Sequence, residues 1–185
     1  MLRETYVVAA GPRGLVLIDP VAAQQRVLFE YLLRNAAAAE VLRQQLLIPV
    51  TLEVGLDDAR RLRQCLGDLG KLGFSIEPFG GNTFLVTAVP ARFPPDDLSG
   101  LLRDILDEVS EHGRLAPDSA DVRLARAAVR HAALSRRPMN ERELAQLLQE
   151  LSRTEMPYTD PSGAPVMVHL PHAEIERRFG RRGGV

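Results

Sequence analysis

Hydrophobic and polar residues alternate with a period of two near the start of the chain, and the period then becomes helical. Residues 4–10 and 14–19 predict two β-strands joined by the Gly-Pro turn "GPRG". A helix is predicted over residues 22–39, where apolar side chains recur on one face. Residues 44–54 form a further extended run, and Pro49 marks an edge or a break in its strand pairing.

The middle of the chain repeats both periods in a compact set. Residues 56–73 predict a helix with leucines on one face and a glycine at its end. Residues 74–79 and 83–90 predict a β-hairpin across a Gly-Gly-Asn turn. Residues 93–113 predict another helix, with Pro95 suited to its start. Together these elements predict a β-α-β-β-α arrangement.

The last third is mainly helical. Residues 118–134 and 140–155 predict helices, and Asn140 with Glu143 forms a capping-box pattern at the start of the second. A loop leads to a short strand at residues 166–170, before a final helix over residues 172–179. Because one late strand cannot form a sheet alone, we expect it to join the two N-terminal strands.

The predicted fold class is therefore α+β, with an outer subdomain interrupted by an inserted one. The outer subdomain is expected to contain the N-terminal hairpin, the C-terminal strand and helices, in residues 1–48 and 114–185. The inserted β-α-β-β-α subdomain is expected over residues 49–113. A chain of 185 residues is long enough for such a core.

The composition and net charge restrict the classes of protein to which the chain can belong. The chain is 45% hydrophobic and 25% charged with a net charge of -1, which is typical of a globular protein and predicts only weak attraction to nucleic acid. The basic run at residues 177–182 is expected to be a solvated end. Cys65 lies among leucines at helical spacing and predicts a buried thiol. A single cysteine and the lack of a 20-residue apolar stretch predict a cytoplasmic protein without a membrane span.

The junction at Asp19 raises a chemical question. A strand ends in this acid and a helix follows at once, which is where α/β enzymes often place reactive groups. The first helical turns nevertheless supply Val21 and Gln25, which neither bind a metal well nor transfer a proton. We expect Asp19 to cap the helix and Glu30 to be an acid on its surface.

Four strings carry a resemblance to a known family. "DPVAAQQRVLFE" is similar to the pattern D-Q-H-A-x-x-E-x-x-x-x-E, and its matching residues are Asp19, Ala22 and Glu30. "IEPFGGNTFLVTAVPARFP" resembles a central hairpin, and "LARAAVRHA" a helix in which Ala125 replaces a cysteine. "PYTDPSGAPVMV" is similar to P-[FY]-x-C-P-H-G-R-P, with Asp160 and Ser162 replacing cysteine and histidine. In this order the strings resemble the C-terminal domain of MutL DNA mismatch repair proteins.

The resemblance implies a degenerate endonuclease site. In nuclease-bearing members, the positions of Val21, Gln25, Ala125, Asp160 and Ser162 carry the ligands of one or two metal ions. Only Asp160 remains a good ligand here, and one carboxylate cannot hold a catalytic metal against water. The resemblance therefore implies a domain that is not an enzyme and has no catalytic residue, metal or cofactor.

An alternative hypothesis is a metal-dependent DNA-nicking endonuclease with a rebuilt metal site. Its candidate ligands are Asp19, Glu30, His131, Asp160, His169 and His172. The two late histidines lack a paired ligand at the spacing of known metal motifs.

A second string, "QQLLIP", resembles the element by which family members contact the replication sliding clamp. Gln44, Leu46, Ile48 and Pro49 match its pattern of glutamine, two alternate hydrophobic residues and proline. An extended segment ending in proline can place its side chains in the apolar pocket of a partner. The alternative is that residues 46–48 form an ordinary buried strand.

The resemblance implies that the outer subdomain forms a homodimer and that the inserted subdomain is regulatory. In the full-length family protein, the dimer would hold two N-terminal ATPase domains together, and no nucleotide-binding motif occurs in this chain. Contacts with a MutS-type mismatch sensor and with DNA are expected through the full-length protein, with at most weak DNA binding here. A third hypothesis is a clamp-binding module whose dimerisation is incidental.

Overall fold

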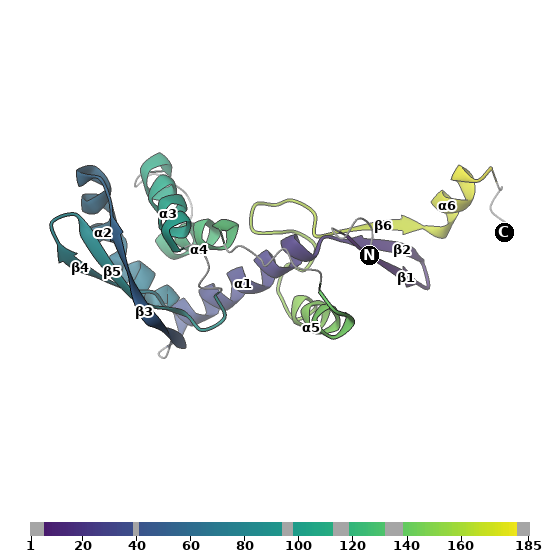
Figure 1. Cartoon of the computed structure of the whole chain (residues 1–185). Helices are drawn as coiled ribbons and strands as arrows, with labels where there is room; N and C mark the ends of the chain where they lie inside the picture. Colours follow the sequence, from purple (N-terminus) through teal and green to yellow (C-terminus); the bar gives the residue numbers. More distant parts are fainter. Residues whose placement is uncertain (1–5, 39–40, 94–97, 113–118, 132–138, 181–185) are drawn as a thin grey trace. The chain divides into compact units, whose positions relative to one another are not determined.

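The computed structural model describes residues 6–38, 41–93, 98–112, 119–131 and 139–180 (Figure 1). The chain divides into two compact units. Unit 1 comprises Met1–Val27 and Arg136–Val185, and unit 2 comprises Leu28–Ser135. Unit 2 therefore lies, in sequence, between the two segments of unit 1. The described part of the chain contains no helix long and apolar enough to cross a membrane.

The limits of the units differ from those drawn on the sequence pattern, which were 48/49 and 113/114. The helix α1 (Pro20–Ala37) contains the first limit, because Leu32 and its neighbours are buried in the core of unit 2. The strand β3 (Arg43–Glu53) and the helix α4 (Ala120–His131) also belong to unit 2. Periodicity shows that a face is apolar, but it does not show which core that face meets.

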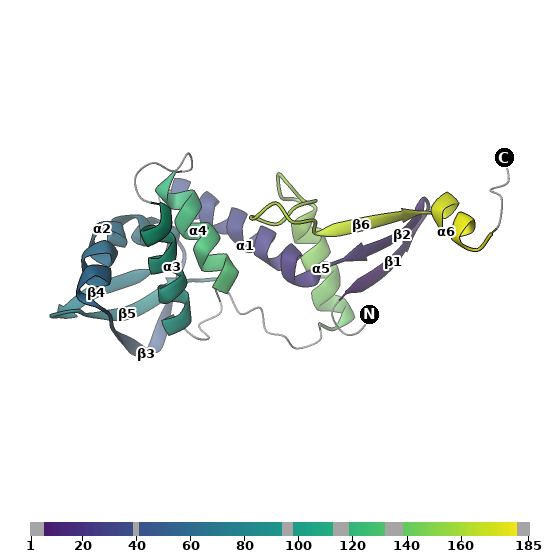
Figure 2. The ribbon, with the colours of Figure 1, turned by 90° about the horizontal axis from the view of Figure 1, so that it is seen from above.

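Unit 1 contains a three-stranded antiparallel sheet. Its strands are β1 (Val7–Gly11), β2 (Gly14–Ile18) and β6 (Met167–Pro171). Figure 2 shows β2 between β1 and β6, and the register pairs Val16 with His169. The prediction that the late strand joins the N-terminal hairpin is confirmed. Gly14 has a φ of 141°, and a side chain there would collide with the Leu170 carbonyl of β6.

One face of this sheet forms the core of unit 1. Val7 and Ile18 pack with Ala23 of α1 and with Leu147 of the helix α5 (Glu141–Leu151). The predicted capping box of α5 is confirmed by its reciprocal hydrogen bonds. The short helix α6 (His172–Arg178) follows β6 directly.

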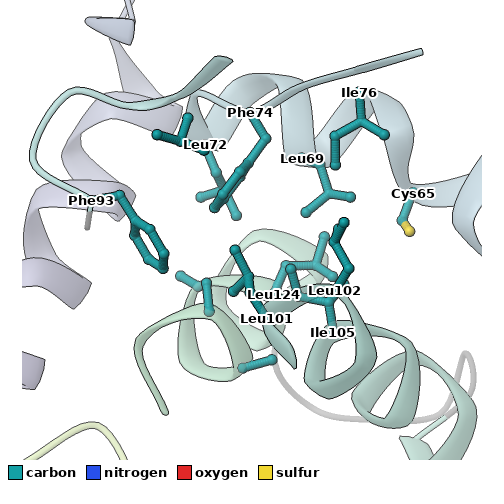
Figure 3. Close-up of a cluster of buried hydrophobic side chains, with 14 of the residues drawn as sticks. Cys65, Leu69, Leu72, Phe74, Ile76, Phe93, Leu101, Leu102, Ile105 and Leu124 are labelled. Atoms are coloured by element: carbon teal, nitrogen blue, oxygen red, sulfur yellow. The ribbon is translucent and has the colours of Figure 1, made fainter. Parts of the chain in front are cut away.

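Unit 2 combines a second antiparallel sheet with helices. Its remaining elements are β4 (Ser75–Gly80), β5 (Thr83–Pro90), α2 (Leu56–Leu72) and α3 (Leu98–His112). The strand order is β3-β5-β4, with β5 in the centre. Figure 3 shows side chains of α2, α3 and α4 meeting in the core. The rings of Phe74 and Phe93 pack edge to face with their centroids 5.5 Å apart. The predicted start of α3 at Pro95 lies outside the described residues.

Cys65 lies in this core on α2, as the leucine pattern predicted. Burial raises the pKa of its thiol from 9.0 to about 11, and the nearby Asp68 carboxylate adds to the rise, against a lowering backbone hydrogen bond. Cys65 should therefore be an unreactive structural thiol.

We predict that iodoacetamide alkylates Cys65 far more slowly in the folded protein than in guanidinium chloride at pH 8. The thiolate is the nucleophile, and a pKa of about 11 leaves little of it at this pH. Mass spectrometry of timed samples measures the rate, with glutathione as the control thiol. Equal rates for folded and unfolded protein would contradict the buried assignment.

Candidate functional site

The second face of the unit 1 sheet is apolar across all three strands. The register pairs Val8 with Leu17 and Leu17 with Val168, so these side chains lie in a row. The residues of this face, here called the outer sheet face, are Val8, Ala10, Leu15, Leu17, Val168 and Leu170. None of the six carries a charge or a hydrogen-bonding side chain. A sheet that is apolar on both faces has a second surface to bury.

The outer sheet face is partly exposed, and three of its six residues, Val8, Ala10 and Val168, are exposed. The relative exposure is 44% for Val8 and 49% for Val168, although both are β-branched apolar residues. A hollow of about 410 Å³ opens beside it, lined by Tyr6, Leu17, Asp19 and residues 165–168. An exposed apolar surface with a hollow is typical of a protein–protein contact.

Asp19 occupies the junction between β2 and α1. Its Oδ1 accepts hydrogen bonds from the backbone N–H groups of Val21 at 2.8 Å and Ala22 at 3.2 Å. These donors belong to the first turn, which has no helical acceptor for them. The predicted capping role of Asp19 is confirmed.

The five positions that the sequence resemblance linked to metal ligands belong to two units. Val21, Gln25, Asp160 and Ser162 belong to unit 1, whereas Ala125 is fully buried on α4 of unit 2. Within unit 1, the structure brings Asp160 and Ser162 together in one loop. Val21 presents only an apolar side chain to solvent.

Asp160 is buried and organises this loop. Its Oδ1 accepts hydrogen bonds from the backbone N–H of Ser162 at 2.8 Å, the Ser162 hydroxyl at 2.7 Å and the Ala164 N–H at 2.8 Å. Three donors on one carboxylate oxygen hold the turn closed. This oxygen therefore serves the fold of the loop.

Arg26 holds the same loop from α1. Its guanidinium is buried and donates from Nε to the Thr159 carbonyl at 2.6 Å and from Nη2 to the Asp160 carbonyl at 2.7 Å. Sequence reasoning missed this residue, because an arginine on a helix carries no sign of a distant carbonyl partner. We call Arg26, Thr159, Asp160, Ser162 and Ala164 the loop clasp.

Of the five positions that the sequence resemblance linked to metal ligands, only Asp160 carries a side chain that is a good metal ligand. Among the described residues, no group of three or more His, Cys, Asp or Glu side chains could hold a metal ion. His169 and His172 are exposed on β6 and α6, and the side chain of His131 lies outside the described residues. Glu30 is buried and pairs with Arg34 at 3.0 Å, so the prediction of a surface acid was wrong. The prediction failed because α1 is buried on more of its surface than the apolar face read from the sequence indicates.

The clamp-like segment forms a bulge in β3. Gln45 pairs with Ala88 and Val50 with Val86, so residues 46–49 lie opposite Thr87 alone. Leu47 is 99% exposed and Ile48 is 77% exposed. Gln44 and Pro49 are exposed as well. The alternative of an ordinary buried strand is therefore wrong for Leu47 and Ile48. Leu46 is half-buried and packs against the core of unit 2.

An exposed apolar sheet face of this kind is typical of a domain that associates with another protein chain, and a second copy of the same chain is the simplest partner. A family model described as the MutL C terminal dimerisation domain matches residues 1–151. The chain is 39% identical over 178 residues to the DNA mismatch repair protein MutL of Geotalea uraniireducens, covering 95% of this chain and 30% of that protein. For the MutL of Exiguobacterium sp. the identity is 33% over 183 residues, with 97% and 30% covered.

The chain belongs to the MutL C-terminal dimerisation domain family. The family resemblance found in the sequence is thereby confirmed. MutL of Koribacter versatilis is 35% identical over 182 residues, covering 97% of this chain and 28% of that protein. The chain thus spans about three-tenths of the length of these curated relatives.

We predict that Asp160→Ala lowers the free energy of unfolding by about 1–3 kcal/mol, because it removes the buried carboxylate that accepts three partly buried hydrogen bonds in the loop. Ser162→Ala removes one of the donors and should cost about 1 kcal/mol. Urea unfolding followed by circular dichroism measures both. An Asp160→Ala protein as stable as the wild type would contradict the loop clasp.

Proposed function

We propose that this chain is the non-catalytic homodimerisation domain of a MutL protein in DNA mismatch repair. The outer sheet face carries the proposal, since its six apolar side chains cover one side of the unit 1 sheet. A two-fold dimer places the same surface on both copies, so an uncharged apolar sheet face is self-complementary. Membership of a dimerisation domain family supports this arrangement.

The proposed work of the dimer is to hold two N-terminal ATPase domains together. The relatives are more than three times as long as the aligned chain, which leaves room for further domains. A permanent dimer gives its attached domains a high effective concentration for one another. Contacts with DNA and with a MutS-type mismatch sensor then belong to the full-length protein.

Absence of nuclease chemistry is part of the proposal. Activation of water for phosphodiester cleavage requires a metal with several protein ligands. At the corresponding positions, the chain has Val21, Gln25, Ala125 and Ser162, and the Oδ1 of Asp160 is already bonded to three donors. Cutting is therefore assigned to another protein of the pathway.

A sliding-clamp contact through Gln44, Leu46, Ile48 and Pro49 is the second part of the proposal. Its support is the β3 bulge, where the apolar side chains of Leu47 and Ile48 are exposed to solvent although they add nothing to the core. Extended peptides commonly dock in this way, with apolar side chains in a pocket and polar groups at its rim.

We predict that Leu17→Asp converts the dimer into a monomer at micromolar concentration. The two-fold axis would bury two unpaired carboxylates, which should weaken association about a hundredfold or more. Sedimentation equilibrium measures the change. Ile48→Asp is the matched control, an apolar-to-acidic change in unit 2 that should leave the dimer intact. A wild-type chain that is monomeric at these concentrations would refute the proposal.

We also predict that the purified protein does not nick supercoiled plasmid above background with Mn²⁺, Mg²⁺ or Zn²⁺. Agarose gels resolve the nicked form, and elemental analysis of the same sample tests for bound metal. Metal-dependent nicking that is lost in Asp160→Asn would instead support the nicking endonuclease with a rebuilt site.

A further inference from the structure

We infer that the helix α6 of each protomer packs into the hollow beside the outer sheet face of its partner, with Phe179 as the apolar anchor. The inference rests on the proposed homodimer and names a second, reciprocal contact within it. The hollow and the helix lie at opposite ends of one strand. Residues 165–168 line the hollow, and α6 begins directly after β6 ends at Pro171.

The outer sheet face alone is small for a stable dimer. Each of its three strands has five residues. With strands about 4.8 Å apart and about 3.4 Å per residue, the face covers roughly 250 Å² in projection. A standard stable interface buries about 800 Å² on each partner. A dimer built on this sheet therefore needs further surface next to it.

The helix α6 has an apolar edge that its own chain leaves in water. None of its seven residues is buried, and Phe179, which follows it, is 78% exposed. The Phe179 N–H donates to the Ile175 carbonyl at 3.2 Å, so the two side chains lie on the same side of the helix. A helix this short is not stable without packing. Its apolar edge therefore indicates a partner outside its own protomer.

The hollow has the complementary character. It measures about 410 Å³, and its lining is apolar apart from the Tyr6 hydroxyl and the Asp19 carboxylate. Asp19 uses its Oδ1 to cap α1, and its Oδ2 can accept from a cation. The last turn of α6 carries Arg177 and Arg178 next to Phe179. Apolar walls with one acid thus match an apolar edge with basic neighbours.

The symmetry of the dimer determines which parts meet. Two sheets that pack face to face are related by a two-fold axis that lies in the plane between them. An axis that crosses the strands reverses their direction, so the hairpin end at Arg13 and Pro171 lies over the Asp19 end of the partner. Figure 1 shows α5 and α6 on opposite sides of the unit 1 sheet, and α5 covers the inner face. The helix α6 therefore projects towards the partner, at the level of its hollow.

An axis along the strands would bring the two hairpin ends together instead. Each α6 would then face the other α6, and both hollows would lie away from either helix. Only the axis across the strands buries both apolar edges and both hollows. Because burial of apolar area favours association, this axis is the one that we assign.

The first test is disulfide formation between two copies of the full chain that carry tags of different mass. Each copy carries one introduced cysteine, and the buried Cys65 stays in place. Phe179→Cys should cross-link under mild oxidation to Tyr6→Cys or to Val168→Cys, since a disulfide needs Cα atoms about 4.4–6.8 Å apart. Arg13→Cys, at the exposed hairpin end, is the matched control and should not cross-link to Phe179→Cys. Mass spectrometry identifies the linked pairs.

The second test is the affinity of the dimer by sedimentation equilibrium. Phe179→Ala should weaken the dimer about tenfold or more, because the two-fold axis removes the anchor from both contacts. Its far-ultraviolet circular dichroism should match that of the wild type, since Phe179 adds nothing to the core of unit 1. Leu56→Ala, which alters an exposed leucine of unit 2, is the control and should change neither quantity.

The outcomes distinguish this contact from the homodimer itself. A wild-type chain that is monomeric refutes the homodimer and the contact together. A wild-type dimer in which Phe179→Ala keeps full affinity refutes the contact and leaves the homodimer standing. Cross-linking of Phe179→Cys to itself or to Arg13→Cys indicates the axis along the strands and refutes the contact too. The absence of cross-links to both hollow positions has the same meaning.

Discussion

The antiparallel pairing of β2 with β6 is the constraint on which unit 1 depends. It joins residues 14–18 to residues 167–171, two segments that are separated by the whole of unit 2. A two-stranded hairpin alone is marginally stable, whereas a third strand creates a sheet with two full faces. One face then packs on α5 and the start of α1, and the other is the apolar outer sheet face.

The loop clasp depends on the same frame. Asp19 caps α1 at the end of β2, which positions the helix that carries Arg26. Arg26 then binds the carbonyls of the loop that leads into β6, and Asp160 closes the turn. Hydrogen bonds thus hold closed the loop that the sequence resemblance linked to metal ligands, and they engage the Oδ1 of its only carboxylate, Asp160.

The prediction of the elements from sequence succeeded where local chemistry decides the outcome. Capping by Asp19, the capping box at Asn140, the Gly-Gly turn between β4 and β5 and the buried Cys65 depend on neighbours in sequence. Pro49 correctly indicated broken pairing in β3. The exposure of Leu47 was not predictable, because the size of the bulge depends on the register that β5 imposes.

The sequence alone determined the α+β class, the order of the elements and the family, because these follow from residue chemistry and periodicity. The tertiary structure alone decided that Arg26 meets the loop carbonyls, that Glu30 is buried and that the units divide within α1. It also assembled the outer sheet face from three strands. Such features join residues far apart in the chain, and their contacts depend on packing geometry that no local pattern encodes.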